Sequence, residues 1–390
     1  MHLRKRIVAS AGMAALAAAA ALSVSSPALA SDDVLHVYVN DNTAGTNTIA
    51  AFNRHADGSL TPSAGSPFAA GGAGTGTIIG SQGALQVTGD GRYLLAVDAG
   101  SSQISVLRIR DDGSLRQVEG SPVSSGGIEP VSIAVHEGLV YVANEGNGVT
   151  GSNYTGFRLS GGGRLTPISG STFTLPNTAN PGDILFNSTG NKVVGVEVGT
   201  TVASTFRIDS FVVGHDGLLT QAPGSPFLAQ APGPFGSEFS PTNPSHLYVS
   251  NAHGGGGNGS VSAFRVAKNG VLSSIGGSPY PDGQTAPCWV EISRDGRYLF
   301  TVNTGSTSIS SYRIHADGSL TLRSTATFSS GGGIRPFDAR LDPSGSHLYV
   351  VDAALKAVTA FAVDGGSLSE LSTPPFALPT NATPFGIVVA

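Results

Sequence analysis

Two glutamates and one arginine occupy the same place in three consecutive repeats of this 390-residue chain. Glu238, Glu291 and Arg340 each stand four residues after a proline that opens a short apolar run. Burial or a like-charged neighbour raises the pKa of a carboxyl group, so one glutamate can act as a general base toward water. The guanidinium can stabilise the oxyanion that forms on an ester carbonyl. The pattern predicts lactone chemistry; its alternatives are an ion network around a narrow channel, or a divalent cation held by Glu238, Glu291 and Asp183.

Five further residues are predicted ligand contacts. Asp183, Trp289 and Asp338 each stand two residues after the proline of their repeat, and Arg335 directly precedes such a proline. Arg335 offers a second guanidinium for the oxyanion. His253 lies beside a run of four glycines in a long loop. Apart from the divalent cation, the sequence predicts no cofactor.

Internal repetition predicts the elements that position these residues. A Gly-x-Leu triplet recurs seven times at steps of 48 to 55 residues, beginning at Gly58, Gly113, Gly163, Gly217, Gly270, Gly318 and Gly366. Each copy holds short runs rich in β-branched and aromatic residues, separated by Asp-Gly and similar turn signals and without helical periodicity. Four strands in each of seven copies predict an all-β fold, a seven-bladed β-propeller with four-stranded antiparallel blades. A stack of β-sandwiches is the alternative.

The first and last repeats indicate how the ring closes. The first copy begins at the strand-like run 36–40 and lacks the proline-led strand that precedes this run elsewhere. The C-terminal residues 384–389 supply a strand of that kind without a following partner. We therefore expect the C-terminal strand to complete the first blade, which also hides strand edges.

Residues 1–30 have the features of an export signal. A basic start at residues 4–6 precedes an alanine-rich apolar stretch, and residues 28–30 form a small-x-small cleavage site. Cleavage after Ala30 would leave residues 31–390 as a single secreted or extracytoplasmic propeller domain. A membrane anchor is the alternative, but the apolar run is shorter than a bilayer span needs. No later apolar run reaches 18 residues, so no membrane span is expected after cleavage.

Composition and charge exclude several classes of protein. Apolar residues make up 40% of the chain and charged residues 12%, unlike a disordered protein. A net charge of −5 with only four lysines is unlike a nucleic-acid-binding protein. The expected partner is a small-molecule ligand or a cell-surface component, and a self-closed ring is expected to be a monomer.

The repeats share an ordered set of motifs: Pro-x-x-Ile/Val, Asp-Gly-Arg, Leu-Tyr-Val-x-Asn, Ile-Ser-x-Phe-Arg-Ile, Gly-x-Leu and Gly-Ser-Pro-Phe. The best matches are residues 293–320, 343–361 and the Ser-Pro-Phe/Tyr motifs at 66–68, 225–227 and 278–280. This set resembles the lactonase-like seven-bladed propellers with YVTN-type repeats, over nearly all of the chain after residue 30. The resemblance implies the propeller fold. The family includes 6-phosphogluconolactonases and carboxy-muconate lactonising enzymes, so the resemblance also implies lactone hydrolysis or formation.

The chain departs from the lactonising members at three motifs. Val131 follows Pro130 where these members have histidine, Trp289 stands where they have glutamate, and Asn303 is followed by Thr304 instead of arginine. No catalytic residue is therefore transferred from the family. Export and the scarcity of cations also argue against a phosphorylated sugar lactone.

The sequence leaves two functions open. The first is an enzyme that hydrolyses or forms a non-phosphorylated lactone in the mouth of the channel, with Glu238, Glu291 and Arg340 as the catalytic residues. The second is a non-catalytic secreted or surface propeller that binds a small molecule, a glycan or a protein.

Overall fold

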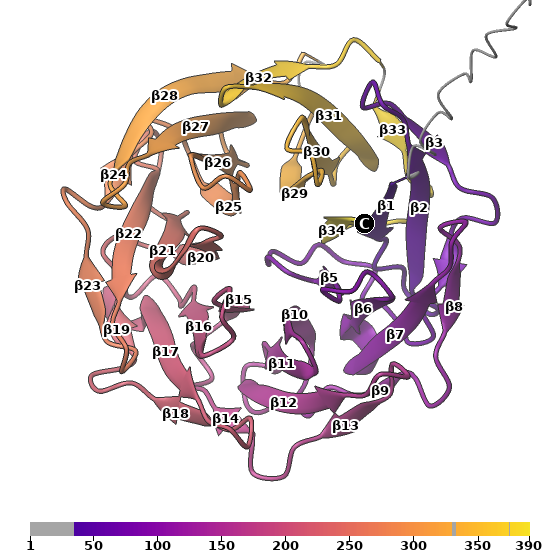
Figure 1. Cartoon of the computed structure of the whole chain (residues 1–390), viewed down its shortest axis with the longest axis horizontal. Coiled ribbons are helices and arrows are strands. Elements are labelled where there is room, and N and C mark those ends of the chain that lie inside the picture. The colour runs from indigo at the N-terminus through magenta and orange to yellow at the C-terminus, as the bar shows by residue number, and fades with distance from the viewer. Residues whose placement is uncertain (1–34, 330–332, 374) are drawn as a thin grey trace, which may run out of the picture. The chain divides into compact units, whose positions relative to one another are not determined.

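A computed structural model describes residues 35–329, 333–373 and 375–390. The predicted signal peptide, residues 1–30, lies outside them. In the described residues, antiparallel strands form seven sheets, and Figure 1 shows these sheets as blades around a central axis. The predicted all-β, seven-bladed propeller is confirmed. Its two helical elements in this part of the chain are the 3-10 turns η1 (Ala99–Ser101) and η2 (Ala203–Thr205).

Each blade has four strand positions, counted outward from the axis. The first strands of blades 1 to 7 are β34 (Ile387–Val389), β5 (Leu85–Val87), β10 (Pro130–His136), β15 (Pro181–Phe186), β20 (Pro234–Ser240), β25 (Pro287–Ile292) and β29 (Pro336–Leu341). The second strands are β1 (His36–Asn40), β6 (Tyr93–Asp98), β11 (Leu139–Asn144), β16 (Lys192–Glu197), β21 (Asn243–Asn251), β26 (Tyr298–Asn303) and β30 (His347–Asp352).

The third and fourth strands form the outer half of each blade. The third strands are β2 (Thr48–Arg54), β7 (Gln103–Ile109), β12 (Asn153–Leu159), β17 (Arg207–Val213), β22 (Ser260–Val266), β27 (Ser308–Ile314) and β31 (Ala357–Asp364). The fourth strands are β3 (Leu60–Pro62), β8 (Leu115–Gln117), β13 (Leu165–Pro167), β18 (Leu219–Gln221), β23 (Leu272–Ser274), β28 (Leu320–Thr327) and β32 (Ser367–Glu370).

In six blades the outer edge continues as a second, two-residue piece that pairs with the same third strand. These pieces are β4 (Phe68–Ala69), β9 (Val123–Ser124), β14 (Phe173–Thr174), β19 (Phe227–Leu228), β24 (Tyr280–Pro281) and β33 (Phe376–Ala377). In several blades the Gly-Ser-Pro motif separates this piece from the fourth strand. There the serine hydroxyl of the motif, in place of a strand carbonyl, accepts a hydrogen bond from an amide of the third strand. Ser66 Oγ, for example, accepts a hydrogen bond from the Ala51 amide at 2.8 Å. Blade 6 lacks the motif, and β28 runs unbroken.

The Gly-x-Leu and Tyr-Val motifs meet between neighbouring blades. In four blades the buried tyrosine hydroxyl of the second strand donates to the carbonyl of the glycine in the next blade's triplet. The pairs are Tyr38 to Gly113 at 2.8 Å, Tyr141 to Gly217 at 2.8 Å, Tyr248 to Gly318 at 3.1 Å and Tyr349 to Gly58 at 3.0 Å. The repeat signature thus records contacts between blades, and the last pair joins blade 7 to blade 1.

The C-terminal strand completes blade 1, as the sequence predicts. Strand β34 pairs antiparallel with β1, with Val37 opposite Val389 and Val39 opposite Ile387. Because the first strand of blade 1 comes from the end of the chain, the pairing of β34 with β1 closes the ring.

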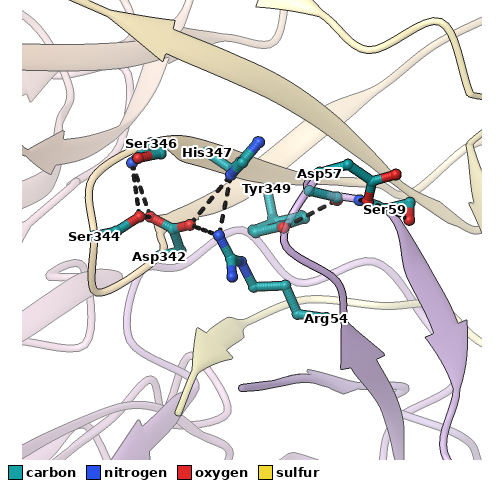
Figure 2. Close-up of polar contacts among 9 residues, drawn as sticks. Arg54, Asp57, Ser59, Asp342, Ser344, Ser346, His347 and Tyr349 are labelled. Atoms are coloured by element: carbon teal, nitrogen blue, oxygen red, sulfur yellow. Dashed lines mark hydrogen bonds and ion pairs between the residues drawn. The ribbon is translucent and has the colours of Figure 1, made fainter. Parts of the chain in front are cut away.

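A buried ion pair reinforces the junction of blades 7 and 1. Figure 2 shows Arg54 of β2 reaching Asp342, which follows β29, with the His347 ring above both. His347 Nδ1 lies 3.1 Å from Arg54 Nη2 and 3.3 Å from Asp342 Oδ2. We call Arg54, Asp342 and His347 the closure cluster.

In the described part of the chain, no helix is both long enough and apolar enough to span a bilayer.

Candidate functional site

The ring has two faces that differ in the chain segments they carry. We call the residue at the start of each first strand its proline position, because it is proline in every blade except blade 2. These residues lie on one face of the ring, which we call the proline face. The first and second strands are joined by turns on the other, the turn face. The loops between second and third strands, including the one with His253, return to the proline face.

A short segment of blade 2 crosses the centre of the ring. Figure 1 shows the chain before β5 running into the middle of the ring. We call residues 79–83 the crossing segment. Ser81 Oγ donates to the Val131 carbonyl at 2.8 Å, and the Gln82 amide donates to the Gly182 carbonyl at 2.9 Å. The segment is therefore bonded to blades 3 and 4.

The side chain of Gln82 extends the crossing to blades 5 and 6. Its Nε2 donates to the Ser237 carbonyl at 2.8 Å, and its Oε1 accepts from the Val290 amide at 2.9 Å. Trp289 Nε1 donates to the Ser81 carbonyl at 2.8 Å. These bonds across the ring close the central channel, so it is not an open pore.

Gly236 leaves the space that this crossing requires. A Cβ at Gly236 would lie 2.3 Å from Gln82 Oε1 and 2.6 Å from the Cys288 carbonyl oxygen. Both distances are far inside van der Waals contact, so any side chain would displace the crossing segment.

The crossing segment forms the floor of a cavity of about 370 Å³ on the turn face. Ser188 and Pro241, from turns between first and second strands, stand among its lining residues. In blades 2 to 7, the residues at the fourth position after the proline position form much of its wall, namely Gln86, Ala134, Leu185, Glu238, Glu291 and Arg340. The wall is mostly apolar along blades 3 and 4 and charged along blades 5 to 7.

The alternation expected along the first strands accounts for this wall. In β25, for example, the residues at the third and fifth positions after the proline are buried, with Val290 at 1% exposure and Ile292 at 4%. Side chains of a strand point alternately to its two sides, so the fourth position points into the cavity. Glu238, Glu291 and Arg340 therefore lie together although 102 residues separate the first from the last.

Glu291 and Arg340 form an ion pair in the charged wall. Arg340 Nη1 donates to Glu291 Oε2 at 2.9 Å, and the Leu341 amide donates to Glu291 Oε1 at 2.9 Å. The two side chains are 18% and 11% exposed, for Arg340 and Glu291 respectively. Both glutamate oxygens are thus engaged, and the guanidinium is held in one orientation.

Glu238 is the acid of this wall that has a carboxylate oxygen without a hydrogen-bond partner. This oxygen is Oε2, which is buried. Burial, and then the negative charge of Glu291, raise the pKa of Glu238 well above its usual value, although Arg340 opposes this shift. Glu238 is therefore protonated over a wider pH range than an ordinary glutamate and is a stronger base once it ionises.

Asp183 and Asp338 lie deeper than the glutamates and are almost completely buried. Asp183 Oδ2 accepts from Ser237 Oγ at 2.8 Å, and its Oδ1 accepts from Ser132 Oγ at 3.1 Å. Burial raises the pKa of Asp183 to about 7, while these hydrogen bonds oppose the shift. Asp338 Oδ1 accepts from the Ala339 amide at 2.9 Å, and its Oδ2 has no partner. Asp183 of blade 4 thus bonds to blades 3 and 5 and holds the three blades together.

Asp338 and the other three predicted contacts do not line this cavity, whereas Asp183 does. Arg335 is exposed toward the proline face, with its guanidinium 5.4 Å from the centre of the Phe337 ring. His253 is exposed on the same face, and its amide donates to the Pro232 carbonyl at 3.0 Å. Trp289 is buried and stacks on Phe337 at 4.8 Å. The structure therefore groups Arg340, and not Arg335, with the two glutamates.

The crossing segment is the part of the site that the sequence analysis missed. Its signal is a departure from the repeat, because Gln82 stands where the other first strands have proline. Proline has no amide hydrogen and fixes its own backbone angle. A glutamine there supplies the amide and side chain that bond across the ring.

No group of three or more His, Cys, Asp or Glu side chains is arranged to hold a metal ion in residues 35–329, 333–373 and 375–390. The divalent cation considered from the sequence stays a prediction. Both oxygens of Asp183 and of Glu291 are already used within the protein.

Comparison with known proteins agrees with the resemblance seen in the repeats. The chain matches the family described as "Lactonase, 7-bladed beta-propeller" over residues 237–384, a range that contains Glu238, Glu291 and Arg340. The resemblance to this family is thereby confirmed. No curated protein matches the chain in sequence.

Several solved structures share the fold. A "putative 6-phosphogluconolactonase" from Bacteroides fragilis is 20% identical with a TM-score of 0.71, covering 94% of this chain and 100% of its own. A second, from Bacteroides uniformis, is 19% identical with a TM-score of 0.73, covering 92% and 100%. A periplasmic gluconolactonase from Pseudomonas aeruginosa is 17% identical with a TM-score of 0.69, covering 91% and 99%. At these identities the similarity shows the fold.

Proposed function

We propose that this chain is an exported hydrolase of non-phosphorylated lactones that works in the cavity on the turn face. The observation that carries the proposal is Glu238, a carboxyl group with a raised pKa beside the fixed Glu291–Arg340 pair in a cavity with a closed floor. The match to the lactonase family and the fold shared with gluconolactonases support a lactone as the substrate.

The proposed reaction opens the lactone ring with one water molecule. Ionised Glu238 takes a proton from water, and the water oxygen attacks the lactone carbonyl carbon. Arg340 stabilises the oxyanion of the tetrahedral intermediate. When the bond from carbonyl carbon to ring oxygen breaks, Glu238 returns the proton to the ring oxygen. The product is the open-chain hydroxy acid, and Glu238 is again ionised.

Glu291 acts in this scheme as a positioning residue. It holds the guanidinium through Oε2 and is itself held by the Leu341 amide. Its charge also raises the pKa of Glu238, which brings the base closer to neutral pH. The paired Arg340 is the only cationic residue that lines the cavity in the described chain, which favours an uncharged substrate over a phosphorylated one.

A lactone panel with Glu238→Gln tests the proposal. The purified chain without residues 1–30 is assayed by acid release on unphosphorylated γ- and δ-lactones. Glu238→Gln keeps the shape of the side chain but removes the base, so we expect kcat to fall about 100- to 10,000-fold. Glu119 provides the matched control: it is exposed, it follows the outer strand β8 and it does not line the cavity, so Glu119→Gln should keep full activity.

Two results would contradict the proposal. Turnover that survives in Glu238→Gln would remove Glu238 from the reaction. A folded protein that hydrolyses no lactone would reject the enzyme and favour the non-catalytic binding propeller.

A further inference from the structure

We infer that the lactone taken by this cavity carries an alkyl substituent instead of ring hydroxyl groups; the inference deepens the proposed function and rests on it. The cavity is divided into a charged side and an apolar side, and few of its polar atoms remain free. These two features together select the class of substrate.

The apolar side begins at the fourth positions of blades 3 and 4. Ala134 and Leu185 point into the cavity from β10 and β15, opposite the charged residues of blades 5 to 7. Val135, Phe239 and Pro241 continue the apolar lining toward the turn face. An apolar group placed along this surface gains free energy in proportion to the area that it removes from water.

Most polar atoms of the cavity are already bonded within the protein. Gln82 uses its amide nitrogen and oxygen on the backbone of blades 5 and 6. Asp183 accepts hydrogen bonds on both oxygens from two serines, and both oxygens of Glu291 are engaged. Glu238, Gln86, Ser188 and the remaining donors of Arg340 are left for a ligand.

These four groups suffice for the ester of a lactone but not for all the hydroxyl groups of a sugar. In the proposed reaction Arg340 binds the carbonyl oxygen and Glu238 binds the attacking water. Gln86 and Ser188 are then the polar side chains left for the rest of the substrate. A sugar lactone carries a hydroxyl group on most ring carbons, and each one buried without a partner costs binding free energy. A lactone with an alkyl tail places the ester on blades 5 to 7 and the tail along Ala134 and Leu185.

A series of δ-lactones with unbranched alkyl tails of increasing length tests this inference. We expect kcat/KM to rise by about fourfold for each added methylene until the tail fills the cavity. Glucono-δ-lactone should be hydrolysed less efficiently than the shortest alkyl lactone. The matched pair of variants is Leu185→Asn in the cavity and Leu228→Asn on the surface, where Leu228 is 63% exposed. Leu185→Asn should flatten the dependence on tail length, and Leu228→Asn should leave it unchanged.

Binding of alkyl δ-lactams, measured by calorimetry on the unmutated protein, separates this inference from the proposed function. A lactam has the shape of the lactone but an amide that resists hydrolysis. Lactam affinity that rises with tail length, in a protein that turns over no lactone, would reject the hydrolase and support the apolar ligand. Efficient hydrolysis of glucono-δ-lactone with no dependence on tail length would support the hydrolase and overturn the apolar ligand. Absence of both lactam binding and lactone turnover would overturn both.

Discussion

The two mostly buried arginine–carboxylate groups of the described chain differ in how completely their acids are bonded. In the closure cluster, Asp342 accepts two hydrogen bonds on Oδ1 and pairs with Arg54 through Oδ2. In the cavity, Arg340 pairs with Glu291 and leaves Glu238 with an unpartnered oxygen. Both oxygens of the acid are therefore engaged at one place, whereas the other place keeps a second acid with an oxygen that has no partner.

The pKa values of the two acids follow this difference. Burial alone would raise the pKa of Asp342, but the hydrogen bond from Ser344 and the charge of Arg54 outweigh it and hold the pKa below the usual range. Burial and the charge of Glu291 raise the pKa of Glu238. At Asp342 the hydrogen bonds and the charge of Arg54 together outweigh burial, so this carboxylate stays ionised as a structural anchor, whereas at Glu238 burial prevails and the group can exchange a proton.

Asp342→Asn is expected to have the largest effect on stability. Removing this charge leaves Arg54 buried at the blade 7–blade 1 junction without its anion, at a cost of about 3–5 kcal/mol in the free energy of unfolding. Chemical denaturation measures the loss. The exposed Asp111 gives the control, because Asp111→Asn should change stability by less than about 0.5 kcal/mol. Equal effects of the two variants would show that the closure cluster does not stabilise the ring.

Glu238→Gln is expected to stabilise the protein at alkaline pH. The folded-state pKa of Glu238 lies above its ordinary value of 4.5, so the neutral acid is favoured in the folded protein. The wild type loses stability relative to Glu238→Gln as the pH rises from 4.5 through the folded pKa, by at most about 1.4 kcal/mol for each pH unit. Unfolding curves from pH 4 to pH 9 check this. A constant difference over that range would mean that the pKa of Glu238 is not raised.

Glu291→Gln is expected to shift the pH profile of activity. The charge of Glu291 is one of the causes that raise the pKa of Glu238. Its removal lowers that pKa, so the acidic limb of the kcat profile should move to lower pH, by on the order of one unit. If the acidic limb of the kcat profile does not move, a titrating group other than Glu238 causes that limb.

The sequence predicted the repeat, the closure of blade 1 by residues near 387–389 and the register of the first strands. These depend on local patterns: turn glycines at constant spacing and the alternation of side chains along a strand. The alternation alone placed Glu238, Glu291 and Arg340 on one side of their strands, and they line one cavity. Their catalytic roles stay predictions until they are tested.

Which charged residues meet was decided by the tertiary structure. Arg335 and Arg340 are five residues apart on one blade, yet they end near opposite faces of the ring, because each residue of a strand advances about 3.3 Å. Arg54 and Asp342 are 288 residues apart and form an ion pair only because the ring closes. The crossing segment likewise bonds to blades that are distant in sequence. Local patterns fix the direction of a side chain, whereas closure of the chain fixes what it contacts.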